Sequence, residues 1–448
     1  MTCPPALRRA APRPATALIA IALVLAAGFV TLGAKLAGAQ IKAEDLPPAP
    51  GALERELSLG PVVKATEGAT DSGSQLASPI DIPFILEGGH IIVEASIDGN
   101  APRPFVFDTG GSNIITPDIA RTLNASVVRT GRVGGIGPKI SHVEIVKVRR
   151  ITIGGATLDE PIVTVLDLPN TIVDRGSRPR LAGLIGAELL ARYAVTIDYT
   201  RRILTLHNPG FRPQSAAFSL PLGFSMSPDG LGHPSIRAEL DGLAGEFVLD
   251  TGAGGQVFVS EKFEREHAPL AQYGKVLTYL SPGGVGGRVN VRLGLGKHLR
   301  IGPSTLSPPL VVSAVDAAGM NPRGSVLAHT AGLIGAAVLA QFVVTIDKQS
   351  GRAHFEPVAG RTLPAVLRGT GMITDKPDHE SFEVLDAVKG SAAERAGLRR
   401  GDRIIEIAGR PARDLSTSDV ASLSERGSLS VRTSDRGLLT LAVGQALP

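Results

Sequence analysis

Short alternating runs of apolar and polar residues begin near Ile80 and continue through most of the chain. The stretch "IIVEASIDGNAPRPFVF" at 91–107 holds two such runs joined by Asp-Gly, and "IRAELDGLAGEFVL" at 236–249 repeats the arrangement. Alternation with a period of two indicates half-buried strands, and Asp-Gly between two runs indicates a hairpin. The 53 glycines and 33 prolines fit many turns between short strands. The pattern therefore predicts a mainly β protein.

The two hairpins belong to an internal repeat. Each ends in Asp-Thr-Gly, at Asp108 and at Asp250. Further on, "GLIGAELLARYAVTID" at 183–198 matches "GLIGAAVLAQFVVTID" at 332–347 at eleven of sixteen positions. Two copies of one domain naturally pack about a pseudo-two-fold axis. We therefore expect two β-rich lobes, lobe 1 at residues 79–215 and lobe 2 at residues 216–360.

The first 39 residues have the features of an export segment. Three arginines precede the apolar run "ATALIAIALVLAAGFVTLGA", and Ala37-Gly38-Ala39 supplies the small residues of a cleavage site. The run is also about long enough to cross a bilayer, so the segment is either cleaved or kept as a membrane anchor. In both cases the remainder is expected outside the cytoplasm, periplasmic or secreted, with anchoring to the inner membrane in the second case. Residues 40–78, rich in Pro, Gly and polar side chains, are predicted to form a linker.

Charge and cysteine content exclude several classes of function. The formal net charge of +4 equals the four basic residues of the export segment, which has no acidic residue, so the charge does not indicate nucleic-acid binding. The only cysteine, Cys3, lies in the same segment and leaves no intramolecular disulfide. The nine histidines show no His-x-x-x-His or His-Glu-x-x-His spacing, and no Gly-x-Ser-x-Gly block occurs. We expect no metal and no cofactor.

A third region, residues 361–448, has a different pattern. The stretch "SFEVLDAVKGSAAERAGLRRGDRIIEIAGRPA" predicts a strand, a short helix, a tight turn and a second strand. Ser391 is suited to cap the start of this helix and Gly397 to end it.

Paired carboxylates are the candidate chemistry. A single Asp-Thr-Gly is commonly only a turn, but two copies related by an axis can bring Asp108 and Asp250 together. Two carboxylates a few ångströms apart do not both ionise easily, so one stays protonated and they titrate as a pair. The ionised acid can take a proton from water while the neutral acid donates to a carbonyl oxygen. Such a pair can hydrolyse an amide without a covalent intermediate.

These motifs resemble the aspartic peptidases of the retroviral, retropepsin-like type (clan AA), here with both lobes fused in one chain of bacterial type. The resemblance covers residues 79 to about 360 and implies two acid-protease β-barrel lobes related by pseudo-two-fold symmetry. It makes Asp108 and Asp250 the catalytic dyad, with Thr109 and Thr251 cross-linking the lobes beneath it. The remaining support residues it implies are Gly110 and Gly252 in the two loops, and Leu184, Ile185, Gly186, Leu333, Ile334 and Gly335 in the bracing blocks. By itself, each of these blocks also fits a tight turn before a buried helix.

The family covers its cleft with glycine-rich hairpin flaps. The candidates here are "GRVGGIG" at 131–137 and "SPGGVGG" at 281–287. Glycine lets such a hairpin bend over a substrate and exclude water. The flap residues are expected to be Gly134, Gly135, Gly137, Gly283, Gly284 and Gly286. A nucleotide-binding loop is the other interpretation, although neither run opens a helix after a strand.

The sequence departs from the family pattern after each Asp-Thr-Gly. Many members have Ser or Thr there, whose hydroxyl donates to the charged carboxylate, whereas this chain has Gly111 and Ala253. Without those donors the dyad should have raised pKa values, and we predict a working pH nearer neutral than that of digestive acid proteases. Gly111 also leaves open a catalytically weak or inactive protein.

The third region resembles bacterial PDZ domains, which are small β-barrels with helices. The resemblance rests on "AAERAGLRRGDRIIEIAGRP". PDZ domains bind a chain terminus by adding it as a strand to a sheet edge. The stretch Gly369, Thr370, Gly371 and Met372 is either the loop that holds the terminal carboxylate or simply the start of a strand.

The sequence therefore predicts an exported aspartic endopeptidase that acts on peptides or unfolded proteins as a monomer. Its PDZ domain would bind a protein C-terminus or an internal peptide of a substrate or partner. The alternative is a protease-fold adaptor that binds peptides without cutting them. A further alternative pairs each lobe with a lobe of another molecule.

Overall fold

The structure is a computed structural model that describes residues 17–20, 75–226, 232–307, 310–315, 326–361, 363, 368–424 and 427–445. Strands make up 50% of the chain and helices 14%, which confirms the prediction of a mainly β protein. The predicted export segment and linker lie outside the described residues, apart from 75–78 and strand β1 (Ala17–Ala20), which pairs in parallel with Gly131–Gly134. Among the described residues, no helix has the length and apolar character needed to cross a membrane.

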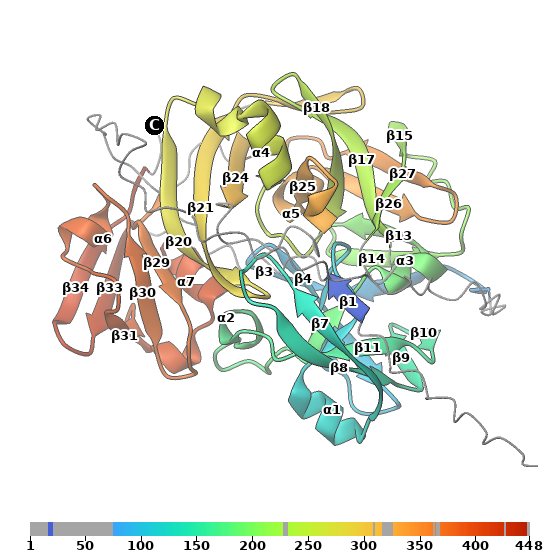
Figure 1. The fold of residues 1–448 in the computed structure, drawn as a ribbon, viewed down its shortest axis with the longest axis horizontal. Helices are drawn as coiled ribbons and strands as arrows, with labels where there is room; N and C mark the ends of the chain where they lie inside the picture. Colours follow the sequence, from blue (N-terminus) through green and yellow to red (C-terminus); the bar gives the residue numbers. More distant parts are fainter. Residues whose placement is uncertain are drawn as a thin grey trace, which may run out of the picture.

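Lobe 1 is built on one curled sheet, with three short helices beside it (Figure 1). After β1, its strands follow the order β7-β8-β11-β6-β12-β5-β4-β9-β10, with β3 paired to β4. The strands are β3 (Ile85–Glu87), β4 (His90–Ile97), β5 (Arg103–Phe107), β6 (Ile114–Ile115), β7 (Ser126–Gly134), β8 (Ser141–Lys147), β9 (Arg150–Ile153), β10 (Ala156–Asp159), β11 (Ile162–Val165) and β12 (Gly183–Ile185). The helices are α1 (Pro117–Leu123), α2 (Asn170–Val173) and α3 (Glu188–Arg192).

Lobe 2 repeats this topology strand for strand. Its sheet has the order β20-β21-β24-β19-β25-β18-β17-β22-β23, with β16 paired to β17. The strands are β16 (Gly223–Met226), β17 (Gly232–Leu240), β18 (Leu243–Asp250), β19 (Val257–Val259), β20 (Val276–Gly284), β21 (Gly287–Gly296), β22 (Leu299–Ile301), β23 (Ser304–Leu306), β24 (Leu310–Val315) and β25 (Gly332–Gly335). The helices are α4 (Glu261–His267) and α5 (Ala336–Leu339), with 3-10 turns η2 (Pro269–Gln272) and η5 (Val326–Ala328).

A six-stranded sheet joins the two lobes. Its order is β15-β27-β26-β13-β14-β2, with strands β2 (Ile80–Pro83), β13 (Ala194–Asp198), β14 (Ile203–His207), β15 (Phe218–Pro221), β26 (Phe342–Asp347) and β27 (Arg352–Pro357). The matching "VTID" segments of the two copies pair antiparallel as β13 and β26, and the hydroxyls of Thr196 and Thr345 lie 2.8 Å apart. Side chains from both strands, such as Ile197 and Ile346, enter one apolar core shared by the lobes. The lobes are therefore one folded unit with its pseudo-two-fold axis through this strand pair.

The PDZ-like region is a separate small sheet with two helices. Its main order is β29-β30-β31-β33-β34, with β32 on β31, and β28 pairs with β35. The strands are β28 (Arg368–Gly369), β29 (Met372–Asp375), β30 (Phe382–Ala387), β31 (Arg403–Ile407), β32 (Arg410–Pro411), β33 (Ser428–Thr433), β34 (Gly437–Ala442) and β35 (Gly444–Gln445); the helices are α6 (Ala392–Arg395) and α7 (Thr417–Leu423), with the 3-10 turn η6 (Ala412–Asp414). The Ser391 hydroxyl accepts the Glu394 N–H, as its predicted capping role requires, and Gly397 follows the helix with φ +82°.

Candidate active site

The two aspartates lie at the ends of equivalent strands. Asp108 directly follows β5, and Asp250 is the last residue of β18. Each strand runs parallel to the strand formed by its own downstream block, β5 beside β12 and β18 beside β25. Both aspartate side chains are fully buried.

The carboxylates lie against the opposite lobe. A methyl group placed on Gly110 would come within 2.5 Å of the Asp250 carboxyl carbon, and one on Gly252 within 2.3 Å of the Asp108 carboxyl carbon. No side chain larger than hydrogen fits such an approach. The structure thus brings Asp108 and Asp250 together at the axis between the lobes.

Two threonines cross-link the lobes beneath the dyad. The Thr109 hydroxyl donates to the Leu249 carbonyl at 2.6 Å and accepts the Thr251 N–H at 3.1 Å. In return, the Thr251 hydroxyl donates to the Phe107 carbonyl at 2.8 Å and accepts the Thr109 N–H at 3.0 Å. Both side chains are fully buried, so four hydrogen bonds in a water-free setting fix the relative position of the two loops.

The downstream blocks run beside the aspartate loops. The Asp108 N–H donates to the Ile185 carbonyl at 2.9 Å, and the Ala187 N–H after Gly186 donates to the Gly111 carbonyl at 2.8 Å. In lobe 2, the Ala336 N–H after Gly335 donates to the Ala253 carbonyl at 2.7 Å. The side chains of Leu184 and Leu333 instead enter apolar clusters on the two sides of the dyad, whereas Ile185 and Ile334 point into the shared core.

Two polar side chains hold the lobe 1 loop and were missed by the sequence reasoning. The Asn113 side-chain carbonyl accepts the Gly186 N–H at 2.8 Å, and the Glu188 carboxylate accepts the Asn113 N–H at 2.9 Å. In lobe 2 a backbone carbonyl, that of Gln256, accepts the equivalent Gly335 N–H. The only signal in the sequence is that the repeats differ here, with Asn113 in one copy and Gly255 in the other.

Burial raises the pKa of both aspartates. The pKa of Asp108 lies well above its ordinary value because the group is buried and faces the charge of Asp250. Burial raises the pKa of Asp250 to about 7, although the N–H groups of Gly252 and Ala253 and a hydrogen bond from Asp108 favour its ionised form. These shifts describe two hydrogen-bonded acids that titrate as a pair and share one proton.

The residues after the two motifs differ in the space around them. A methyl group on Gly111 would come within 2.6 Å of an Asp108 carboxylate oxygen, so this site does not accept a larger side chain without displacing the carboxylate. At Ala253 a methyl group is already present, and its N–H donates to the Asp250 carboxylate at 3.1 Å. Backbone groups therefore supply donors where no hydroxyl exists.

The two glycine-rich hairpins meet tip to tip. Flap 1, the β7–β8 hairpin, carries Gly134, Gly135 and Gly137, and flap 2, the β20–β21 hairpin, carries Gly283, Gly284 and Gly286. The Gly137 N–H donates to the Val285 carbonyl and the Lys139 N–H to the Gly286 carbonyl, each at 3.1 Å. A methyl group on Gly135 or Gly137 would collide with the flap 2 backbone at 2.3 Å or less, so these glycines permit the contact.

Each flap tip places one apolar side chain in the opposite lobe. Ile136 of flap 1 packs with the lobe 2 residues Val248, Ala253 and Leu333. Val285 of flap 2 packs in the lobe 1 cluster that contains Val106 and Leu184. Both tips are buried, and the sequence reasoning selected the glycines around them but not these two residues. The flaps are closed in this structure.

Two family profiles match parts of this chain. The family profile described as "Aspartyl protease" matches residues 93–189, and the profile described as "PDZ domain" matches residues 383–432. The chain combines a retropepsin-like aspartyl protease unit with a PDZ domain. Among solved structures, the crystal structure of aspartic proteinase from Irpex lacteus is similar at 12% identity and a TM-score of 0.39, covering 63% of this chain and 98% of that chain. A comparison with curated proteins gave no match.

The predicted carboxylate loop of the PDZ domain lies next to a sheet edge. Gly369 pairs with Gly444, Gly371 has φ +74° above the Ser391 side chain, and Met372 begins β29, the edge strand of the main PDZ sheet. The Met372 N–H donates to the Thr370 hydroxyl at 3.3 Å, and the Thr370 carbonyl accepts the Ala393 N–H at 2.9 Å. The turn at Gly371 leads directly into β29.

No group of three or more metal-binding side chains occurs within the part of the chain that the structure describes.

Proposed function

We propose that this protein is an exported aspartic endopeptidase whose Asp108/Asp250 pair activates water to hydrolyse peptide bonds. The observation that carries the proposal is the contact of each buried carboxylate with the Asp-Thr-Gly loop of the other lobe. The close glycine packing and the threonine cross-links give both acids fixed positions, which is what general acid–base catalysis requires.

Asp250 is given the role of the ionised acid because its carboxylate accepts the N–H groups of both Gly252 and Ala253. Ionised Asp250 takes a proton from a water molecule, whose oxygen attacks the peptide carbonyl carbon. Protonated Asp108 donates its proton to the carbonyl oxygen, giving a neutral tetrahedral diol. The diol then collapses: the C–N bond breaks, the amine leaves with a proton taken from Asp250, and a diol hydroxyl returns a proton to Asp108.

An extended peptide or unfolded protein segment is the expected substrate. Closed flaps and a buried dyad exclude water and folded proteins, so the flaps must separate before a chain can enter. The PDZ domain is proposed to bind chain ends or internal peptides of a substrate or partner by strand addition at β29.

The proposed location and assembly rest on the sequence. The basic residues and apolar run of the first 39 positions support export to the periplasm or beyond, with or without a membrane anchor. Because both aspartates come from one chain, a monomer contains a whole site, and the rate per molecule should not depend on protein concentration.

The test compares cleavage of an unfolded protein by the wild type and by Asp250→Asn, with Asp118→Asn on the exposed surface of α1 as the matched control. We expect a loss of about a thousandfold or more for Asp250→Asn and no change for the control. Cleavage by Asp250→Asn at the wild-type rate would exclude the dyad.

A protease-fold adaptor that binds peptides without cutting them is the second candidate. It is supported by the flap-tip side chains Ile136 and Val285, which occupy the apolar clusters beside the dyad. It predicts equal peptide affinity for the wild type and Asp250→Asn, with no cleavage by either.

A further inference from the structure

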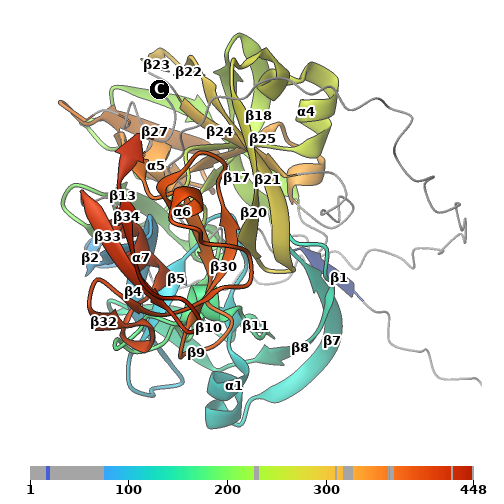
Figure 2. The same cartoon turned by 90° about the vertical axis from the view of Figure 1, so that its left-hand side faces the viewer.

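The PDZ domain packs along one face of flap 2 (Figures 1 and 2). Leu277 and Leu293, paired across the base of the flap 2 hairpin, form an apolar cluster with Ile373 of β29, Leu385 of β30 and Val388. All five side chains are buried. The hairpin that closes over the dyad therefore has a second domain against its outer side.

The tip of flap 2 is tied to the PDZ domain by charge. Arg288 directly follows the tip glycines, and its guanidinium contacts the carboxylates of Asp375 at 2.9 Å and Glu383 at 2.5 Å. The Arg288 side chain is 39% exposed, so these pairs lie at the rim of the interface.

The PDZ domain is at the same time fixed to lobe 1. The ammonium of Lys376 contacts Asp174 at 3.1 Å, with both side chains fully buried, and also donates to the Leu415 carbonyl at 2.5 Å. Arg178 contacts Asp419 at 2.6 Å. We call these contacts the lobe 1 anchor.

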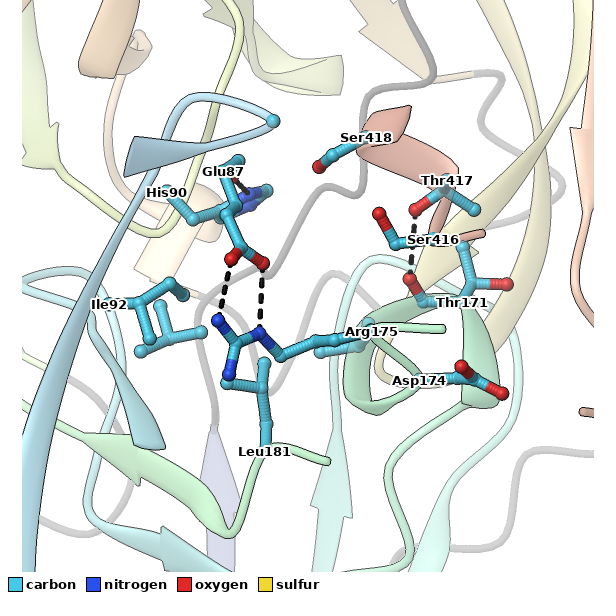
Figure 3. A pocket seen from close by; sticks show the side chains of 13 residues that line it. Glu87, His90, Ile92, Thr171, Asp174, Arg175, Leu181, Ser416, Thr417 and Ser418 are labelled. Atoms are coloured by element: carbon cyan, nitrogen blue, oxygen red, sulfur yellow. Dashed lines mark hydrogen bonds and ion pairs between the residues drawn. The ribbon is translucent and has the colours of Figure 1, made fainter. Parts of the chain in front are cut away.

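Beside Asp174 of this anchor, side chains of lobe 1 and of residues 416–418 line a pocket of about 40 Å³ (Figure 3). The Thr417 hydroxyl donates to the Thr171 carbonyl at 3.2 Å on one side, and Arg175 pairs with Glu87 on the other. A space of this size holds only a few water molecules.

One carboxylate of the PDZ domain contacts both lobe 1 and flap 2. Asp375 accepts the Thr171 hydroxyl of lobe 1 with one oxygen and the Arg288 guanidinium of flap 2 with the other. The PDZ domain thus connects the tip of flap 2 to the lobe on the other side of the cleft.

We propose that the PDZ domain is a latch that holds flap 2 closed over the dyad, with Arg288 as the contact that must break before the flap opens. Separation of the flap tips moves Arg288 relative to lobe 1, while the buried Lys376–Asp174 pair keeps the PDZ domain on lobe 1. Breaking a buried pair costs far more than breaking a partly exposed one, so the Arg288 contacts open first. The control of cleavage by this latch rests on the peptidase function proposed above, whereas the flap movement itself does not.

Hydrogen exchange of the full chain tests the latch directly. In Arg288→Ala we expect the amides of residues 281–288 to exchange about fivefold faster than in the wild type, which corresponds to about 1 kcal/mol for a rim ion pair. Glu383→Gln should have a smaller effect in the same direction. The matched control is Arg300→Ala, which removes another exposed ion pair of lobe 2, with Glu239. The β22–β23 hairpin serves as the internal reference in every Arg288 and Glu383 variant.

The same variants are then assayed for cleavage of an unfolded protein. If opening limits access to the dyad, kcat/KM of Arg288→Ala rises by a similar factor. Exchange in flap 2 that is no faster in Arg288→Ala than in Arg300→Ala would overturn the latch. Faster exchange with no cleavage by any variant would keep the latch and reject the peptidase.

Discussion

At the residue scale, burial governs the chemistry of the two aspartates. We expected raised pKa values because Gly111 and Ala253 offer no hydroxyl to the carboxylates. The structure gives the same direction with a different leading cause, since loss of solvent contributes most at both Asp108 and Asp250. The backbone N–H groups after each motif oppose the shift, so the missing hydroxyls matter less than the absence of water.

The first prediction concerns stability and pH. A folded-state pKa above the ordinary value of 3.8 means that the folded protein binds more protons than the unfolded chain. The wild type should therefore lose unfolding free energy as pH rises from about 4 through about 7. Asp250→Asn cannot ionise, and we expect it to be more stable than the wild type at pH 8 by on the order of 2 to 4 kcal/mol.

Urea denaturation at pH 4.5 and pH 8 measures this difference, with Asp118→Asn as the control. An Asp250→Asn protein with the same dependence of stability on pH as the wild type would contradict a raised pKa at this site.

The second prediction concerns position 253. Ala253→Ser adds a hydroxyl donor next to ionised Asp250, which should lower its pKa. Because catalysis needs Asp250 ionised, the acid limb of the pH–rate profile should move to lower pH by about one unit. An unmoved profile would count against the proposed role of Asp250.

Gly111→Ala provides the contrast in lobe 1. Its methyl group would lie 2.6 Å from the Asp108 carboxylate and should reduce the rate at every pH rather than move the profile.

At the element scale, the two aspartate loops depend on each other. Thr109 and Thr251 each use one hydroxyl to donate to the opposite strand and to accept from the opposite loop. Neither loop has this set of partners within its own lobe. The position of the dyad is therefore a property of the pair of lobes, while each strand and turn can form by itself.

The third prediction concerns these threonine cross-links. Thr251→Val leaves the buried Thr109 N–H and Phe107 carbonyl without the partners they now have, and we expect a loss of about 2 to 4 kcal/mol in unfolding free energy. Displacement of the loop should also reduce kcat/KM by about a hundredfold. Thr251→Ser keeps the hydroxyl and is the control for denaturation and kinetics. Equal stability of the valine and serine variants would refute the cross-link.

At the scale of the whole molecule, three surfaces hold the chain together. The β13–β26 strand pair joins the lobes below the dyad, the flap tips join them above it, and the PDZ domain contacts both at the side. The PDZ contact with lobe 1 contains a buried ion pair, which fixes orientation more than it adds stability.

The fourth prediction concerns this ion pair. Lys376→Met removes the ammonium partner of buried Asp174, which keeps only His379 and the more distant Arg180 beside it, and should lower the unfolding free energy by about 3 kcal/mol. A second change, Asp174→Leu, removes the buried carboxylate and should restore most of the loss. The measurement is urea denaturation of the single and double variants. A Lys376→Met protein as stable as the wild type would show that Lys376 and Asp174 do not form a buried ion pair.

The sequence predicted much of the local structure for physical reasons. Alternation identified the strands around Asp108 and Asp250, since side chains of a strand face opposite sides. The capping role of Ser391 followed from short-range hydrogen bonding. Ile136 and Val285 could not be selected in the same way. The local sequence around an apolar residue between glycines does not indicate which surface will pack against it. Asn113 and Glu188 were missed for the same reason, because Asn113 lies far along the chain from both of its partners, Gly186 and Glu188.

By itself, the sequence determined the two similar lobes, the aspartate loops and the PDZ domain, because strand periodicity, turn residues and repetition are local properties. Only the tertiary structure decided that the aspartates share one buried site and that each flap tip packs in the opposite lobe. It also decided that the PDZ domain contacts both flap 2 and lobe 1. These contacts join residues from different lobes or domains, and their energies depend on burial and distance, which exist only after the chain has folded.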